Sequence, residues 1–189
     1  MKVVGIMGSP RIGGNTDMLL DEALRGAHSQ GAEIEQIVVD KLDISPCREL
    51  CSCEIDGRCA IRDDMDGIYG KLLEADVVIV ASPMFFSGLT SQLKALVDRC
   101  QALWVRRYVL KQEPPKMGRK GAFIAVGATK GERMFDGAIQ TVRHFFDAVG
   151  VDYSEELLVR GVDRKGEIVE HSSALAGAFA LGERLAKAG

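Results

Sequence analysis

The sequence lacks a surplus of positive charge, and it also lacks any long apolar run. Its 24 Lys and Arg residues are outnumbered by 27 Asp and Glu residues, which gives a net charge of −3. A chain without a basic surface is poorly suited to nucleic acid or anionic lipid, so we expect neither partner. No stretch approaches the ~20 apolar residues that a membrane helix requires, and Lys2 leads straight into a short apolar run rather than a signal segment. The expected location is the cytoplasm, away from membranes.

Cysteine and aromatic residues are also scarce, with five cysteines and 6% aromatics in 189 residues. Thiols stay reduced in the cytoplasm, so a framework of structural disulfides is not expected. Four of the five cysteines nevertheless cluster in one segment, which indicates metal or redox chemistry. The length suits one buried core, so we expect a single domain over 1–189 with a cysteine-bearing insert at about 43–64.

Short apolar runs alternate with amphipathic segments along the chain. The runs predict buried strands at 2–8, 35–39, 76–82, 121–127 and 153–159. The intervening segments predict helices at 16–30, 65–75, 89–104, 133–149 and 168–187. This alternation predicts an α/β fold, a flavodoxin-like doubly wound parallel sheet of five strands in the order 2-1-3-4-5 with helices on both faces. In such a sheet, ligands bind beyond the carboxyl ends of the first and third strands.

A polar glycine loop at 8–17 joins the first predicted strand to the first predicted helix. Its backbone N–H groups and the helix dipole favour an anion, and Ser9, Arg11, Asn15 and Thr16 add donors or positive charge. A phosphate is the ligand that this arrangement favours. The same residues also fit an ordinary helix cap that follows a glycine turn, and both interpretations stay open.

Two further loops are expected at the same edge of the sheet. The loop at 82–90 is apolar and aromatic, which favours contact with a flat ligand, although its phenylalanines also fit packing beneath a neighbouring loop or subunit. The loop at 127–131 has two glycines, and Lys130 either reaches a ligand carbonyl or is solvated. A phosphate end, a planar apolar wall and a glycine clamp together predict FMN as the ligand.

Three groups of segments resemble one known family. They are 8–11 with 14–16, then 82–88 leading into 92–95 and 98–99, and finally 130–137 leading to 145–147. The chain resembles the NADPH-dependent FMN reductase family, which has a flavodoxin-like fold, and within it the iron-sulfur flavoproteins. These segments span most of the chain, and their combination is far more specific than any single glycine pattern.

The resemblance implies three sets of FMN-binding residues. The FMN phosphate would be held by Ser9, Arg11, Gly14, Asn15 and Thr16. The isoalloxazine ring would be lined by Pro83, Met84, Phe85, Phe86, Ser87 and Gly88. The polar edge of the ring would be completed by Thr129, Lys130 and Gly131. No side chain is assigned as a catalytic acid or base, because the flavin itself accepts hydride.

The resemblance also implies an oxidoreductase. The chain would pass electrons from NAD(P)H or a reduced carrier through FMN to a quinone, a flavin or another small acceptor. The alternative is an electron-transfer flavoprotein that docks ferredoxin-like partners and does not use nicotinamide. A homodimer or homotetramer is expected in either case.

The clustered cysteines are Cys47, Cys51, Cys53 and Cys59, separated by three, one and five residues. Thiolates this close in sequence can converge on one centre, and iron-sulfur clusters commonly take four cysteine ligands. In the family that the chain resembles, the first three cysteines are usually separated by two residues each, so Cys51 is displaced by one position here. An iron-sulfur cluster, zinc, and free or redox-paired thiols all remain open.

Other charged groups favour structural roles. Asp63, Asp64 and Asp66 open a predicted helix, where carboxylates bind free N–H groups, so we expect capping rather than metal binding. Arg106 and Arg107 lie among aromatic residues, and either could meet a pyridine nucleotide phosphate. Arginine and aromatic residues are typical of interfaces, so a subunit contact is favoured for this segment.

Overall fold

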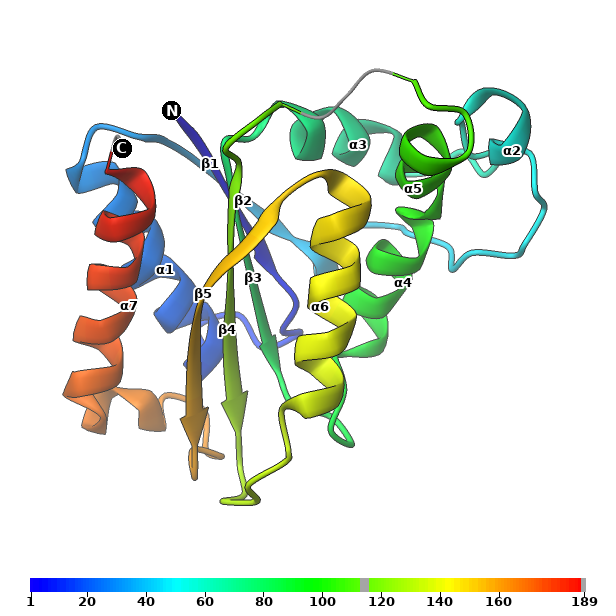
Figure 1. Cartoon of the computed structure of the whole chain (residues 1–189). Helices are drawn as coiled ribbons and strands as arrows, with labels where there is room; N and C mark the ends of the chain where they lie inside the picture. The colour runs from blue at the N-terminus through cyan, green and yellow to red at the C-terminus, as the bar shows by residue number, and fades with distance from the viewer. Residues whose placement is uncertain (113–115, 188–189) are drawn as a thin grey trace.

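The sheet has the strand order that the sequence predicts. The computed structural model describes residues 1–112 and 116–187, and Pro114 and Pro115, which suggested a helix break, lie outside them. The five strands pair in parallel in the order β2-β1-β3-β4-β5 (Figure 1). Their bounds are β1 Lys2–Met7, β2 Glu33–Val38, β3 Val77–Pro83, β4 Lys120–Gly127 and β5 Asp152–Arg160. The doubly wound parallel sheet is therefore confirmed.

Helices cover both faces of the sheet. The α-helices are α1 Asn15–Ser29, α2 Cys53–Asp56, α3 Met65–Glu74, α4 Ser91–Arg99, α5 Gln101–Tyr108, α6 Asp136–Val149 and α7 Ser172–Ala186, with 3-10 turns η1 Val39–Lys41 and η2 Glu167–Glu170. Helices α1 and α7 cover one face of the sheet, and α3, α4, α5 and α6 lie on the other (Figure 1). Each group of helices forms an apolar core against its face. None of these helices is both long and apolar enough to cross a bilayer.

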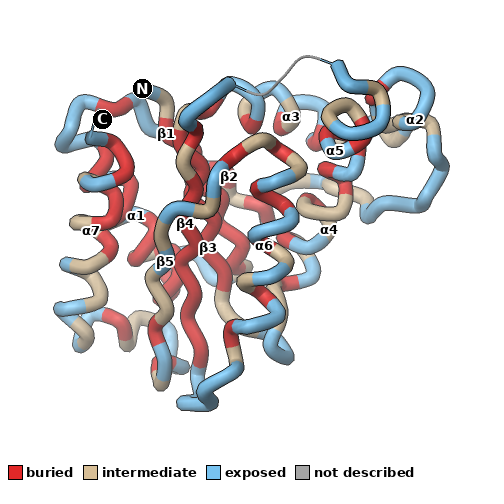
Figure 2. The backbone as a smooth tube through the Cα atoms, in the orientation of Figure 1, coloured by how far each residue is buried: buried red, intermediate tan, exposed pale blue. Residues whose placement is uncertain are grey.

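Burial follows each strand's place in the sheet. Strands β1, β3 and β4 have neighbours on both sides and are almost wholly buried, whereas the edge strands β2 and β5 are largely exposed or half-buried (Figure 2). This difference explains why the central strands are continuous Val and Ile runs, while β2 and β5 carry several charged residues.

The single helix predicted over 89–104 is wrong. The structure has two helices there, α4 and α5, with a break at Cys100. At the break, the Tyr69 hydroxyl donates a hydrogen bond to the Arg99 carbonyl oxygen at 3.0 Å, and this oxygen would otherwise accept from the next helical turn. The apolar periodicity continues across the break, so the sequence pattern alone does not reveal it.

Helices α1 and α7 approach each other very closely. A Cβ atom added to Gly26 would overlap the Phe179 carbonyl, and one added to Gly182 would overlap the Ala23 carbonyl. The two backbones therefore touch where both glycines lie. This contact fixes the position of α1, whose first residues carry the predicted phosphate loop.

Candidate functional site

Loops that follow four parallel strands surround one cavity at the carboxyl edge of the sheet. Segments 9–16 after β1, 83–85 after β3, 126–128 after β4 and 162–165 after β5 all contribute lining residues. This cavity is small, about 100 Å³. The first three segments belong to the loops that the sequence assigned to a ligand.

The loop after β1 is folded tightly by its own backbone. Gly14 N–H donates to the Arg11 carbonyl oxygen at 3.0 Å, and Gly13, with a φ of 67°, donates to Asp17 Oδ2 at 2.7 Å. A Cβ on Gly14 would lie 2.8 Å from the Arg11 carbonyl oxygen, so this turn requires glycine. The N-cap of α1 is Gly14, and no side chain caps the helix. The first N–H groups of α1 are therefore available to an anion in the cavity.

The polar side chains of this loop differ in what they can offer a ligand. Arg11 is exposed at the cavity wall, and Ser9 Oγ accepts a hydrogen bond from Arg11 N–H at 3.1 Å. Thr16 is 2% exposed and lines the cavity. Asn15 Nδ2 donates to the Arg164 carbonyl at 2.8 Å, and Asn15 Oδ1 accepts from Ile168 N–H at 3.1 Å. The amide of Asn15 thus joins two chain segments and has one remaining N–H for an anion.

Thr90 was not predicted as a site residue, and it connects two walls of the cavity. Its fully buried hydroxyl donates to the Gly8 carbonyl at 2.6 Å and accepts from Leu93 N–H at 3.3 Å, as the N-cap of α4. The base of the glycine loop is thereby tied to the helix that follows the aromatic loop. A threonine directly before an amphipathic helix predicts an N-cap, so the role of Thr90 in α4 could have been predicted from the sequence. Its hydrogen bond to Gly8 could not, because the two residues are far apart in the chain.

The aromatic loop forms a tight turn that exposes phenylalanine. Phe85 and Gly88 exchange two backbone hydrogen bonds of 3.0 Å, and Phe86 and Ser87 between them have φ values of 51° and 60°. Left-handed backbone is uncommon for a bulky residue such as phenylalanine and is typical of functional sites. Phe85 is 49% exposed and Phe86 is fully exposed. Pro83, Met84 and Phe85 line the cavity, while Phe86, Ser87 and Gly88 extend beyond it.

The glycine clamp after β4 stands farther from the cavity than expected. Ala128 lines the cavity, but Thr129, Lys130 and Gly131 do not, and all three are exposed. The Thr129 carbonyl accepts from Gly161 N–H at 3.2 Å, which joins this loop to the one after β5. The loop after β4 therefore contacts the loop after β5, and of its residues after Gly127 only Ala128 lines the cavity.

Residues Val162, Asp163 and Lys165 line the cavity and were missed by the sequence analysis. They occupy a loop bounded by Gly161 and Gly166, both with left-handed backbone. Their position could have been predicted from the sequence, because every loop that follows a strand of a parallel sheet lies at the same edge of the sheet.

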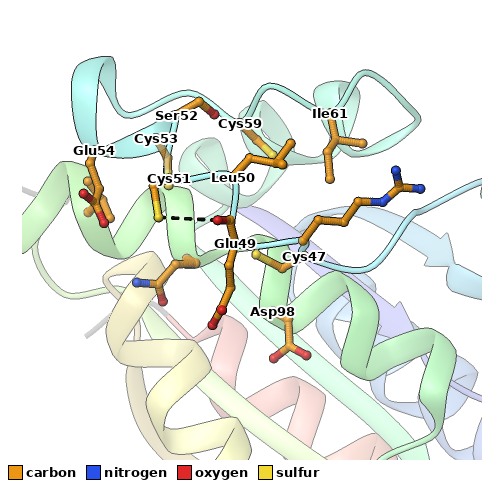
Figure 3. A pocket seen from close by; sticks show the side chains of 13 residues that line it. Cys47, Glu49, Leu50, Cys51, Ser52, Cys53, Glu54, Cys59, Ile61 and Asp98 are labelled. Atoms are coloured by element: carbon orange, nitrogen blue, oxygen red, sulfur yellow. Dashed lines mark hydrogen bonds between the residues drawn. The ribbon is translucent and has the colours of Figure 1, made fainter.

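The four clustered cysteines border a second, larger cavity of about 970 Å³ (Figure 3). It lies between the insert and the adjoining ends of α4 and α5, away from the strand-end cavity. Cys47, Cys51, Cys53 and Cys59 all contribute to its wall, but no three His, Cys, Asp or Glu side chains of the described residues form a group that could hold a metal ion. The four cysteines therefore lie around one cavity, as their spacing predicted, but their thiols do not converge on a single point.

The surroundings of two of these thiols raise their pKa values above the ordinary value. The Glu54 carboxylate raises the pKa of Cys51, and burial raises the pKa of Cys53. Cys51 Sγ donates to the Glu49 carbonyl oxygen at 3.5 Å, and both residues have left-handed backbone. Thiols with raised pKa values are weak nucleophiles at neutral pH, because the thiolate is the reactive form.

The predicted roles of the neighbouring charged residues are partly confirmed. Asp63 Oδ1 accepts from Met65 N–H at 3.0 Å at the start of α3, but the N-cap is Asp64, whose side chain makes no capping bond and accepts instead from Asp43 N–H at 2.8 Å. Asp66 pairs with Arg62 at 3.2 Å. Arg107 binds the Asp147 carbonyl, and Arg106 packs against Gly57, so neither lines the strand-end cavity. Cys100 is buried, as expected.

The sequence of this chain matches a known protein family. Residues 1–154 match the family described as NADPH-dependent FMN reductase. An iron-sulfur flavoprotein of Methanocaldococcus jannaschii is 38% identical over 146 residues, which cover 77% of this chain and 72% of the relative. A Bacillus subtilis protein, named for NAD(P)H-dependent, FMN-containing oxidoreductase activity, is 33% identical over 187 residues, which cover 97% of this chain and 98% of the relative.

Solved structures share the fold. An NAD(P)H:quinone oxidoreductase from Methanothermobacter marburgensis superposes with a TM-score of 0.76 and is 16% identical, with 100% of this chain and 98% of the other covered. This likeness supports the architecture of the sheet and its helices.

Proposed function

This chain belongs to the NADPH-dependent FMN reductase family, and we propose that it passes electrons from NAD(P)H or a reduced carrier through FMN to a small acceptor such as a quinone or a flavin. The chemistry that bound FMN supplies is hydride acceptance and electron release. One observation carries the proposal: the uncapped start of α1 and the exposed aromatic loop meet at a single cavity.

The residues present fit FMN at both of its ends. The cavity suits a phosphate, because it is lined by the start of α1 and by the Arg11 side chain. Its volume of about 100 Å³ is below the ~300 Å³ or more of pockets that enclose a whole ligand, so FMN would be only partly enclosed in this conformation. Met84 and Phe85, which also line the cavity, would contact the apolar surface of the flavin.

The residues of this chain bind and orient the cofactor, and none is assigned a proton transfer. Arg11 and the first turn of α1 would hold the anionic end of FMN, while Pro83 and the turn at 85–88 would contact its ring. The exposed side of the aromatic loop leaves room for an electron donor. The proposal therefore predicts direct contact between the donor and the cofactor.

A spectroscopic titration of the purified full-length chain tests this function. We expect bound FMN to give the flavin absorption bands, and Arg11→Ala to weaken FMN binding by about 1 to 3 kcal/mol, because a charge-assisted contact is lost. Arg25→Ala on the exposed face of α1 is the matched control. Protein that takes up no added FMN would refute the proposal.

Stopped-flow reduction distinguishes the electron donors. Rapid bleaching of the bound flavin by NADPH supports the oxidoreductase. Bleaching by reduced ferredoxin alone supports an electron-transfer protein that docks carrier proteins and does not use nicotinamide.

The second candidate, an iron-sulfur flavoprotein, is favoured by the shared cavity of four cysteines and by the relative of that name. The thiols as arranged do not form a metal site within the described residues, so no electron step is assigned to a cluster here. Iron and zinc analysis of anaerobically prepared protein is the test, with Cys53→Ser compared against Cys100→Ser. Iron lost only in Cys53→Ser supports the cluster, zinc lost in the same way supports a zinc site, and protein without either metal refutes both.

A further inference from the structure

The loop after β5 forms one wall of the strand-end cavity and lies beyond the part of the chain that matches the family. The match covers residues 1–154, whereas Val162, Asp163 and Lys165 line the cavity. These residues therefore have no assignment from the family, and their contribution follows from this structure.

The Asn15 side chain holds this loop against the start of α1. Its Nδ2 donates to the Arg164 carbonyl at 2.8 Å, and its Oδ1 accepts from Ile168 N–H at 3.1 Å. Asn15 is also the first residue of α1. The loop after β5 is thus fixed directly to the helix start whose N–H groups face the cavity.

The loop is also ordered internally. Glu167 Oε2 accepts hydrogen bonds of 2.8 Å from Asp163 N–H and Arg164 N–H, and both bonds lower the pKa of Glu167. At the other end, Val162 N–H donates to the Gly127 carbonyl at 3.2 Å. Lys165 therefore extends from a preformed turn, which reduces the entropy cost of placing its charge.

The charges at the cavity favour an anion at this point. Its charged lining residues are Arg11, Asp163 and Lys165. Neither cation forms an ion pair with any residue that the structure describes. Lys165 Cε lies 4.0 Å from the position that a Cβ on Gly13 would occupy, so the lysine stem lies over the glycine turn. Arg11 and Lys165 approach the same turn from different segments of the chain.

We propose that Lys165 is a specificity-determining residue that binds the phosphate of FMN together with Arg11, so that the site selects a phosphorylated flavin over riboflavin. This inference rests on the proposed FMN-dependent function. It assigns phosphate recognition to two segments far apart in the sequence, and Asn15 holds them together.

Equilibrium binding of FMN and of riboflavin to the full-length protein tests the inference, with flavin fluorescence as the readout. We expect Lys165→Met to weaken FMN binding about 10-fold and to leave riboflavin binding unchanged, because only FMN carries the phosphate. The salt dependence of FMN binding should become shallower in this variant. Lys165→Arg should retain most of the preference for FMN.

Arg164→Met is the matched control, because it removes a positive charge from the same loop at a residue that does not line the cavity. It should leave the ratio of the two affinities unchanged. Asp163→Asn provides a test of opposite sign, since loss of the lining carboxylate should tighten FMN binding and leave riboflavin unaffected.

The outcomes separate this inference from the proposed function. If the wild-type protein binds no FMN, both fail. If the wild-type protein binds FMN and Lys165→Met keeps the wild-type ratio of affinities, the function stands and the role of Lys165 is wrong. An equal loss in Arg164→Met would show a general charge effect and would also overturn the inference.

Discussion

Arg99 shows how one buried charge positions a whole segment. Its side chain has no exposed surface, and its guanidinium donates to the Ser45 carbonyl at 2.9 Å, to Asp63 Oδ2 at 2.6 Å and to the Ile61 carbonyl at 3.1 Å. These three partners flank the cysteine segment on both sides. Arg99 therefore fastens both ends of the insert to the end of α4.

Replacement of Arg99 should destabilise the folded protein. We expect Arg99→Leu to lower the free energy of unfolding by about 3 kcal/mol, because it leaves the Asp63 carboxylate buried without its partner. Arg25→Leu is the matched control, since Arg25 forms an exposed pair with Glu22 and such pairs contribute little. Urea unfolding of both variants measures the difference. Equal stabilities would contradict the role given to Arg99.

Asp63 makes the stability of the insert depend on pH. Burial alone would raise the pKa of Asp63, but hydrogen bonds from Arg99 and from the N–H groups of Ser45 and Met65 outweigh it and lower this pKa below its ordinary value. A carboxyl with a lowered pKa in the folded state stabilises the protein above its unfolded pKa of about 4. That contribution is lost as the pH falls further.

The wild-type protein should therefore lose more stability between pH 6 and pH 3 than Asp63→Asn does, because asparagine does not titrate. Chemical unfolding at several pH values compares the two slopes. Parallel pH profiles would show that Asp63 does not contribute.

Single residues also mark the limit of the sequence analysis. Arg11 and Thr16 were placed correctly at the cavity, because a glycine loop between a strand and a helix has one common geometry. The bonds from Asn15 to Arg164 and Ile168 span about 150 positions, and nothing local in the sequence indicates them. Lys165 was also missed, although it lies in the loop after β5, and a loop that follows a parallel strand is expected at the same edge of the sheet.

At the scale of elements, strands were easier to predict than helix ends. All five strands were found within a few residues. Strands β1, β3 and β4 are buried apolar runs, as predicted, whereas the edge strands β2 and β5, which were also predicted to be buried, are largely exposed or half-buried. The division of 89–104 into α4 and α5 depends on Tyr69, a residue of α3, and so could not be derived from the periodicity of that segment. The four clustered cysteines border one cavity, but the left-handed backbone at Glu49 and Cys51 is not indicated by the sequence.

The contact between α1 and α7 predicts a strongly position-dependent effect of substitutions in α7. Gly182→Val should lower the melting temperature markedly, since any Cβ overlaps the Ala23 carbonyl and the helices must separate, at a cost of about 3 kcal/mol. Gly177→Val is the control in the same helix, because a Cβ there meets only Leu157 at 3.7 Å. Both changes alter helix propensity equally. Similar melting temperatures would contradict the close contact.

At the scale of the whole molecule, exposed aromatic side chains predict association. Phe85, Phe86, Trp104 and Tyr108 are all exposed, and the rings of the last two contact each other at a tilt, with centroids 5.6 Å apart. Aromatic residues are enriched at the centres of subunit interfaces. We expect light scattering to give a mass that is a multiple of 20.5 kDa, two or four chains. A mass of one chain at micromolar concentration would refute this.

The sequence predicted the architecture of the whole molecule, because alternating strands and helices of this length permit few arrangements. It could not predict how large the strand-end cavity is or which residues of each loop line it. Those properties depend on side-chain packing between segments, as Thr90 and Gly8 illustrate.

Helix α4 begins beside the glycine loop, where Thr90 binds Gly8, and ends beneath the cysteines, where Asp98 lines their cavity. Its nine residues form a rigid rod of roughly 12 Å. The glycine loop and the cysteine cavity are therefore held at a fixed separation, and a change at one of them can reach the other only through movement of the whole helix.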